Sequence, residues 1–307
     1  WEHKNWNITD LPEFELAITI DRPELYYDFL QKDWTRFCHD YWKNNFLEHH
    51  TLSKKRVTRI YIGNQFCHNL FPRKELLFQV LEKALENNLA VTLAFSYIRN
   101  HLLEEIDELL QELEVWCQSR EKEAGKDQEE IIVNDWAMPI LLQGKPHLKP
   151  VLGVLLNKRR KDVRLPYKHG IGNHVDSLAE NNLNCGFYQD YLKNTFDIQR
   201  FEFESCGYKV TIPDGHHSLH LPFFQTNTSQ YCTLYAVCRY GDREKQKLPE
   251  NCPKYCEQKV FLYPKHLKMV GRYNSLFGYD EKILWDEKQL QDYLEQGIDR
   301  IVVNVSL

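Results

Sequence analysis

Short apolar runs alternate along the chain with longer segments of helical periodicity. The apolar runs are rich in β-branched and aromatic residues, and they have the length of buried strands. They cover residues 14–20, 56–63, 89–96, 131–134, 150–157, 199–205, 218–224, 258–264 and 299–305. Apolar residues at helical spacing predict helices at 23–50, 72–87, 101–126 and 286–296, and a short helix before the strand at 150–157. This alternation is typical of parallel α/β proteins.

The pattern predicts one α/β domain over residues 1–307. About eight strands with helices between them fit a single (β/α) barrel, or a distorted version of it, better than two domains. The chain is long enough for this, because its 307 residues are 42% hydrophobic and can fill a sizeable core. The alternation weakens over 206–260, and we expect this segment to be a cysteine-bearing insertion or cap on the barrel.

Charge and composition narrow the functional classes. The formal net charge of −5 argues against non-specific binding of nucleic acid through bulk charge, although a local basic patch stays open. No apolar run approaches the roughly 20 residues that a membrane helix needs. The first residues, WEHKNWNITD, contain no basic segment followed by an apolar one. Nine cysteines are ordinary for a reduced protein of this length. We therefore expect a cytoplasmic protein without a membrane span.

Cysteines are the most informative residues of the chain. Cys232, Cys238, Cys252 and Cys256 lie within 25 residues of one another, and Cys67 lies far away in the sequence. Thiols gathered this closely are either disulfide-bonded or bound to a metal, and the reduced compartment favours a metal. Four cysteines suit tetrahedral zinc or an iron–sulfur cluster, and the spacing alone does not decide between them. The remaining cysteines are scattered, and we expect them to be unliganded: Cys38, Cys117, Cys185 and Cys206.

Several motifs together resemble a known family. They are RIYIGNQFC at 59–67, IIVND at 131–135, PVLGVLLN at 150–157, SQYCTLYA at 229–236 and CPKYC at 252–256. In this order they look like the collagenase-like peptidase family, peptidase family U32. The resemblance implies a barrel-like α/β fold and, as in several members, a [4Fe–4S] cluster held by four cysteines. The segment 206–260 would then be a cluster-binding insertion.

The resemblance also implies which residues form the site. Cys67 matches the early loop ligand, and Cys252 and Cys256 match the closing pair of cysteines. The remaining ligand stays open, because Cys232 has the matching sequence context and Cys238 has nearly the expected distance to Cys252. The prediction is therefore four of these five cysteines, with zinc as the alternative metal. Asn134 and Asp135 resemble a family Asn-Asp pair at a strand end, although Ala137 stands where a glycine is common.

The hydroxylase members of the family imply oxygen-independent hydroxylation of an aromatic ring or a nucleobase, with prephenate as oxygen donor in some of them. A dicarboxylate donor needs cationic anchors, and Arg159, Arg160 and Arg164 follow a strand on the side where barrel enzymes place their sites. These arginines also fit a solvated basic loop. The substrate would be a small aromatic molecule or RNA. Two alternatives are a non-catalytic cluster subunit paired with a homologous U32 partner, and a zinc-stabilised binding protein.

Other candidate residues are less specific. His216, His217 and His220 fit a turn with surface histidines as well as a ligand or proton-shuttle role. His68 follows Cys67 and could tune a metal site by a hydrogen bond. The sequence contains no phosphate-binding loop, no HExxH and no GxSxG motif, and no protease constellation, so protease activity is not expected and no catalytic residue is assigned.

Overall fold

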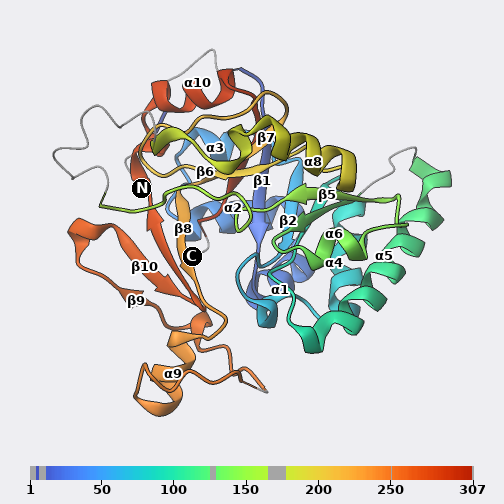
Figure 1. The fold of residues 1–307 in the computed structure, drawn as a ribbon, viewed down its shortest axis with the longest axis horizontal. Helices are drawn as coiled ribbons and strands as arrows, with labels where there is room; N and C mark the ends of the chain where they lie inside the picture. The colour runs from blue at the N-terminus through green and yellow to red at the C-terminus, as the bar shows by residue number, and fades with distance from the viewer. Residues whose placement is uncertain (1–4, 7–11, 125–128, 165–177, 250, 306–307) are drawn as a thin grey trace.

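The protein is built on a nearly closed barrel of parallel strands (Figure 1). The computed structural model describes residues 5–6, 12–124, 129–164, 178–249 and 251–305. Within them, one sheet has eight strands in the order β5-β4-β3-β2-β1-β12-β7-β6. The strands are β1 (Glu15–Ile20), β2 (Arg59–Gly63), β3 (Ala90–Ala94), β4 (Glu129–Val133), β5 (Leu148–Leu152), β6 (Glu202–Glu204), β7 (His217–Leu221) and β12 (Ile298–Val303).

Closure of this sheet comes from a short contact between its two outer strands. Leu152 of β5 pairs in parallel with Phe201, beside β6, and the Leu152 N–H donates to the Arg200 carbonyl at 3.0 Å. All other neighbours in the sheet are also parallel. The expectation of a (β/α) barrel-like fold is therefore confirmed.

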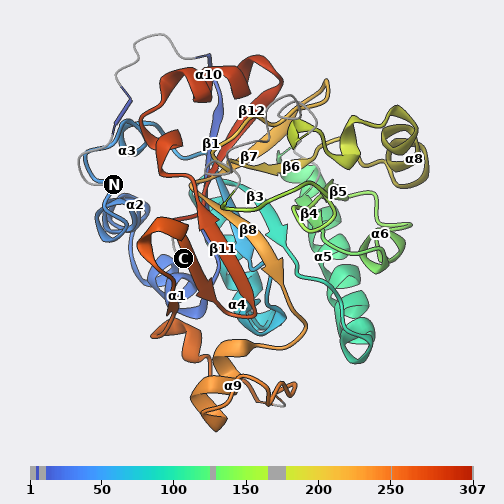
Figure 2. The ribbon, with the colours of Figure 1, turned by 60° about the vertical axis from the view of Figure 1, so that its left-hand side comes forward.

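Helices cover the outside of the barrel (Figures 1 and 2). They are α1 (Pro23–Gln31), α2 (Trp34–Asn44), α3 (Thr51–Lys54), α4 (Lys74–Glu86), α5 (Leu103–Ala124), α6 (Ala137–Leu141), α8 (Gly186–Phe196) and α10 (Glu287–Glu295). A further helix, α9 (Thr233–Tyr240), lies away from the barrel. Single 3-10 turns are η1 (His68–Leu70), η2 (Asn100–Leu102), η5 (Asn182–Asn184), η6 (Tyr255–Glu257), η7 (Lys265–Leu267) and η8 (Glu281–Leu284). The helix expected over 23–50 is broken, because the Asp33 side chain accepts from the Arg36 N–H at 2.9 Å and so starts α2 as a new helix.

A second, antiparallel sheet is inserted between β7 and β12. It has four strands in the order β8-β11-β10-β9, with β8 (Phe223–Thr228), β9 (Phe261–Leu262), β10 (Met269–Arg272) and β11 (Ser275–Tyr279). The strand expected over 218–224 divides at Pro222, which has no N–H for a continuous ladder, so β7 stays in the barrel and β8 enters the second sheet. The segment 206–260, expected to be an insertion, includes β7, which belongs to the barrel, and only part of the second sheet. Figure 1 shows the second sheet beside the barrel, with α9 projecting beyond it.

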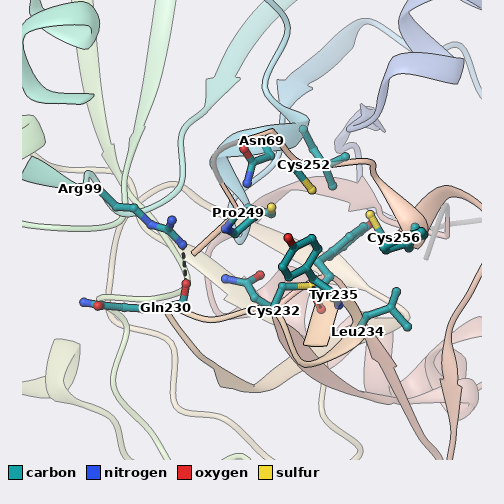
Figure 3. Close-up of a pocket in the computed structure, with 14 residues that line it drawn as sticks. Asn69, Arg99, Gln230, Cys232, Leu234, Tyr235, Pro249, Cys252 and Cys256 are labelled. Atoms are coloured by element: carbon teal, nitrogen blue, oxygen red, sulfur yellow. Dashed lines mark hydrogen bonds between the residues drawn. The ribbon is translucent and has the colours of Figure 1, made fainter. Parts of the chain in front are cut away.

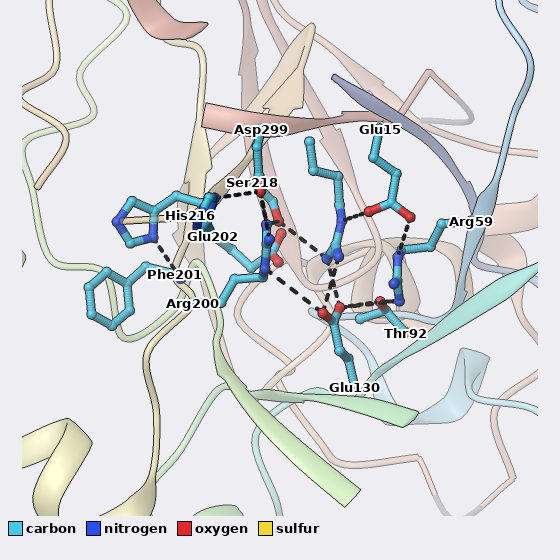
Figure 4. A network of polar contacts seen from close by, with 12 residues as sticks. Glu15, Arg59, Thr92, Glu130, Arg200, Phe201, Glu202, His216, Ser218 and Asp299 are labelled. Atoms are coloured by element: carbon cyan, nitrogen blue, oxygen red, sulfur yellow. Dashed lines mark hydrogen bonds and ion pairs between the residues drawn. The ribbon is translucent and has the colours of Figure 1, made fainter. Parts of the chain in front are cut away.

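Side chains fill the interior of the barrel in layers. The middle layer is mostly apolar, and its buried members are Ala17, Tyr61, Ala94, Ile132, Val151 and Val302. Next to it, at the amino ends of the strands, lies a layer of charged residues that pair with one another (Figure 4). Arg300 binds both oxygens of Glu130, at 2.6 and 3.1 Å, and its Nε donates to Glu15 at 2.6 Å. This ionic layer closes the amino end of the barrel, so a ligand would enter at the opposite end.

Candidate functional site: a four-cysteine cavity beside the barrel mouth

The first thiol of the site, Cys67, is positioned by the loop that follows β2. Gly63 ends this strand with φ +106°, and a Cβ at this position would lie 2.6 Å from the carbonyl oxygen of Ala94. Glycine is therefore required here by both conformation and space. The Asn64 side chain then accepts hydrogen bonds from the N–H groups of Phe66 and Cys67, both at 2.9 Å. This turn directs the chain, and Cys67 with it, toward the second sheet.

The other three thiols of the site come from the insertion. Cys232 is the N-cap of α9, where its Sγ accepts from the Tyr235 N–H at 3.3 Å and donates to the Tyr273 carbonyl at 3.0 Å. Cys256 lies in η6, and its carbonyl accepts from the Arg272 Nε at 3.0 Å. Cys252 lies four residues before Cys256. The turn between β10 and β11, which holds Arg272 and Tyr273, thus braces two of the cysteine segments.

One cavity of about 20 Å³ brings these four cysteines together (Figure 3). Cys67, Cys232, Cys252 and Cys256 all line it, with apolar and aromatic neighbours that include Leu70, Leu234, Pro249, Tyr235 and Tyr255. A single water needs about 10–15 Å³ on the same scale, so the cavity is small. Cys238 packs against the same apolar cluster but does not line the cavity. All nine cysteines are free of disulfide bonds.

Burial favours the protonated form of three of these thiols, Cys67, Cys232 and Cys256. Burial raises the pKa of Cys67 and of Cys256 to about 12, and the neighbouring thiols add to the effect. The pKa of Cys232 is raised for the same reason. A bound cation reverses this balance, because a coordinating thiol is deprotonated outright.

The four thiols line a common cavity, but they are not arranged around a single metal ion in the structure. Within the described part of the chain, no group of three or more histidine, cysteine or acidic side chains is placed to hold a metal ion as the structure stands. Tetrahedral zinc, with Zn–S bonds of about 2.3 Å, needs its four sulfurs within about 3.8 Å of one another. A [4Fe–4S] cluster binds each thiolate to a different iron, so its four sulfurs lie farther apart around a common cavity.

A second cavity, of about 40 Å³, opens at the carboxyl ends of the barrel strands. Its walls come from many barrel strands and their following loops: Thr19, Asp21, Tyr61, Gly63, Asn64, Gln65, Phe66, Ala94, Val154, Glu204, His220 and Asn304. Tyr273 of the second sheet also lines it, and this residue lines the cysteine cavity as well. The Tyr273 hydroxyl donates to Asp21 at 3.3 Å. The two cavities are therefore neighbours that share one wall.

Comparisons with known proteins do not place the chain in a family. No protein-family model matches it. No curated protein matches it either. The resemblance to peptidase family U32 thus rests on the sequence motifs and stays a prediction. Among the helices that the structure describes, none is long and apolar enough to cross a membrane.

The predicted substrate residues Asn134 and Asp135 brace loops at the carboxyl end of β4. The Asn134 side chain donates to the Phe95 carbonyl at 2.7 Å and accepts from the Leu155 N–H at 3.1 Å. The Asp135 carboxylate accepts from the N–H of Ala137 at 3.0 Å and so supports the start of α6. Neither residue lines the two cavities.

The three predicted arginine anchors also lie outside both cavities. Arg159 donates to the Cys206 thiol at 3.1 Å and to the Glu204 carbonyl. Arg160 is exposed, and Arg164 is exposed and pairs with Asp162 at 2.8 Å. The basic loop that follows continues into 165–177, outside the described residues. The contacts of Arg159 hold the start of the loop against the barrel.

The histidines separate into different environments. His216 is exposed and lies 2.9 Å from Asp299. His217 and His220 are buried, on opposite faces of β7, and of these three histidines only His220 lines the barrel mouth. Burial lowers the pKa of His68 to about 4, and this residue does not line the cysteine cavity.

Sequence reasoning missed most of the barrel-mouth residues, including Asp21, Tyr61, Glu204 and Tyr273. One signal was present. The strand at 199–205 reads QRFEFES, so two glutamates, Glu202 and Glu204, alternate with phenylalanines. In a barrel whose outer face is covered by helices, such alternation places the carboxylates inside the barrel. Both glutamates are indeed buried there.

Proposed function

We propose that the chain binds a [4Fe–4S] cluster through Cys67, Cys232, Cys252 and Cys256. The observation that carries this proposal is the single cavity that all four line, although they come from three separate segments. Scattered structural cysteines have no reason to converge in this way, and the five thiols singled out in the sequence include these four. Cys238, the fifth, is assigned to the apolar packing of α9.

The surroundings of the thiols support a cluster. The walls of the cavity are largely apolar, and such walls limit the access of water and tune the reduction potential of a bound centre. Arg99 also lines the cavity, and its positive charge would offset the net negative charge of four thiolates on iron. When bound, the cluster supplies one-electron transfer.

We further propose that the protein takes part in oxygen-independent hydroxylation or another modification of an aromatic or nucleobase substrate. The family resemblance implies this activity, and the neighbouring barrel mouth offers the place for a substrate. Tyr61, Phe66 and Tyr273 give that mouth aromatic walls that can contact a ring. The protein's own residues would orient the substrate next to the wall that separates it from the thiols.

A second candidate is a cluster-bearing subunit that pairs with a homologous partner. An apolar patch on α8, in α6 and directly before α6 favours it. Phe187 is 82% exposed, and Trp136, Tyr191 and Ile140 are also exposed; the Trp136 and Tyr191 rings both contact Phe196. Exposed aromatic patches of this kind often mark protein interfaces. A chain that binds iron but turns over substrate only together with a partner would decide for this candidate.

Single cysteine substitutions test the ligand set. The wild-type chain and the variants Cys67→Ala and Cys238→Ala are purified without oxygen, and their iron and acid-labile sulfide are measured. Cys67→Ala is expected to lose the cluster, while Cys238→Ala, a matched change in the same apolar cluster, is expected to keep it. Retention of full iron by Cys67→Ala together with loss by Cys238→Ala would refute the assignment. A Cys117→Ala variant serves as a remote control.

A further inference from the structure

A buried histidine with one unused ring nitrogen faces the barrel mouth. His220 is only 2% exposed, and its ring lines the mouth cavity. Its Nε2 hydrogen-bonds to the Glu202 carboxylate. Among the described residues, no hydrogen-bond partner of Nδ1 is found. Nδ1 is also not among the side-chain atoms that lack a partner and are closed off from solvent. Nδ1 therefore opens onto the cavity.

Glu202 fixes the orientation and the tautomer of this ring. The carboxylate is fully buried and also accepts from the Tyr61 hydroxyl at 3.0 Å. Burial works against its ionisation, but His220 and Arg300 hold its pKa below the ordinary value. An ionised carboxylate can only accept, so in the neutral form of the ring Nε2 carries the proton and Nδ1 is left as an acceptor. This pairing of carboxylate and imidazole is the arrangement that prepares a histidine to act as a base.

Charge balance around the mouth indicates the kind of molecule that fits. Among the described residues that line the mouth, Asp21 and Glu204 are the carboxylates and none is a lysine or an arginine. Each carboxylate already has a cation outside the lining, since Arg22 lies 4.0 Å from Asp21 and Lys161 pairs with Glu204. A dicarboxylate or a phosphate would thus meet two carboxylates and, among the described lining residues, no lysine or arginine. An uncharged molecule with hydroxyl groups can donate to these acceptors.

We propose that the barrel mouth binds a small uncharged molecule with at least one hydroxyl group, and that His220 acts on it as a general base. The hydroxyl donates to Nδ1, its O–H bond breaks as an N–H bond forms on Nδ1, and the electron pair stays on the ligand oxygen. The Glu202 carboxylate stabilises the resulting imidazolium through Nε2–H. Glu202 is a positioning residue, because it acts through the ring.

This inference deepens the proposed function by naming the class of substrate, but it does not depend on a metal. None of the groups that carry it is a thiol. A chain that binds no iron can still bind such a ligand at His220, and a chain that binds iron can fail to do so. The two proposals therefore fail separately.

The test uses the full chain labelled with ¹⁵N-histidine and reads the ring nitrogens by nuclear magnetic resonance. The His220 signals are identified by their loss in His220→Gln. We expect the free protein to show a protonated Nε2 and an unprotonated Nδ1. Titration with glycerol and with catechol, as aliphatic and aromatic hydroxyl probes, is expected to shift Nδ1 more than Nε2 and to saturate for at least one of them. Succinate, the dicarboxylate probe, is expected to leave both unchanged.

His217 provides the matched reference on the same strand. Its ring stacks on the Phe201 ring, with 4.8 Å between the ring centroids, and its Nδ1 accepts from the Phe201 N–H at 3.2 Å. The His217 ring thus lies away from the mouth. Its signals should not respond to any probe. Glu202→Gln is expected to move the ring proton of His220 toward Nδ1, a change in tautomer that general destabilisation does not produce. A protonated Nδ1 in the wild-type chain, no saturable shift with either hydroxyl probe, or an equal response to succinate would each overturn the proposal.

Discussion

Replacement of Glu130 by glutamine tests the ionic layer that closes the amino end of the barrel. Glu130 is buried among Arg59 and Arg300, with Arg300 bound to both of its oxygens. Burial opposes ionisation, but the two arginines outweigh it and hold the pKa of Glu130 at about 2, compared with an ordinary value of 4.5. The charged form of this side chain therefore stabilises the folded protein.

The magnitude follows from that difference in pKa. At about 1.36 kcal/mol per pKa unit, the ionised Glu130 contributes about 3 kcal/mol to the free energy of unfolding. Because the pKa is lower in the folded state, this contribution is fully present above the unfolded value of 4.5 and is lost as the pH falls toward 2. Glu130→Gln removes the charge and leaves Arg300 without its main partner, a loss that typically costs about 3–5 kcal/mol in buried pairs.

Urea unfolding measured from pH 7 downward gives the required comparison. At pH 7 we expect Glu130→Gln to have a free energy of unfolding about 3 kcal/mol lower than the wild type. The difference should shrink steadily below about pH 5, because the wild-type carboxylate then takes up its proton on unfolding.

The neighbouring Glu129 supplies a control, because its pKa is shifted in the opposite direction. Burial raises the pKa of Glu129, although Arg120 lies near its carboxylate. Its charged form thus disfavours the folded state at neutral pH, and Glu129→Gln should be no less stable than the wild type at pH 7. A Glu130→Gln penalty that is independent of pH, or an equal penalty for both variants, would refute the reasoning.

Three further changes probe the loops that carry the site. At Gly63, where φ is positive, the change Gly63→Ala places a Cβ 2.6 Å from a backbone oxygen. We expect the free energy of unfolding in urea to fall by about 1–3 kcal/mol and the iron content per chain to be lower. Tyr26→Phe removes a buried 2.9 Å hydrogen bond to the turn after Cys67, and should cost about 1 kcal/mol in the same assay. Lys161→Met leaves the buried Glu204 without its cation and should lower the stability by about 3–5 kcal/mol, whereas Arg164→Met breaks only an exposed pair and should cost less than about 1 kcal/mol.

The barrel strands could be predicted from the sequence because their burial leaves a direct pattern. Strands such as β2 and β12 are short apolar runs with β-branched residues, bounded by polar segments. The first helical region was harder, because its apolar spacing continues across Asp33 while the N-cap there starts a new helix. The strands β10 and β11 were missed, since MVGRYNSLFGY has glycines and polar residues among its apolar ones and pairs only within the second sheet.

The candidate site was predictable only in its thiols. Five candidate cysteines are visible without a structure, four of them close in sequence and Cys67 by its motif. Whether Cys67 or Cys238 lines the cavity with the others depends on the path of the chain after β2 and on the direction of α9. The barrel mouth was not visible in this way. Its residues, such as Asp21, Tyr61 and His220, come from separate strand ends and are brought together only when the barrel closes.

The most direct test of the central claim is the metal content of the wild-type chain. The protein is purified without oxygen, its iron, acid-labile sulfide and zinc are quantified, and its visible spectrum is recorded. The four-cysteine cavity predicts about four irons and four sulfides per chain and a brown protein whose spectrum changes on reduction. A colourless protein with one zinc per chain, or with no bound metal after reconstitution with iron and sulfide, would contradict it.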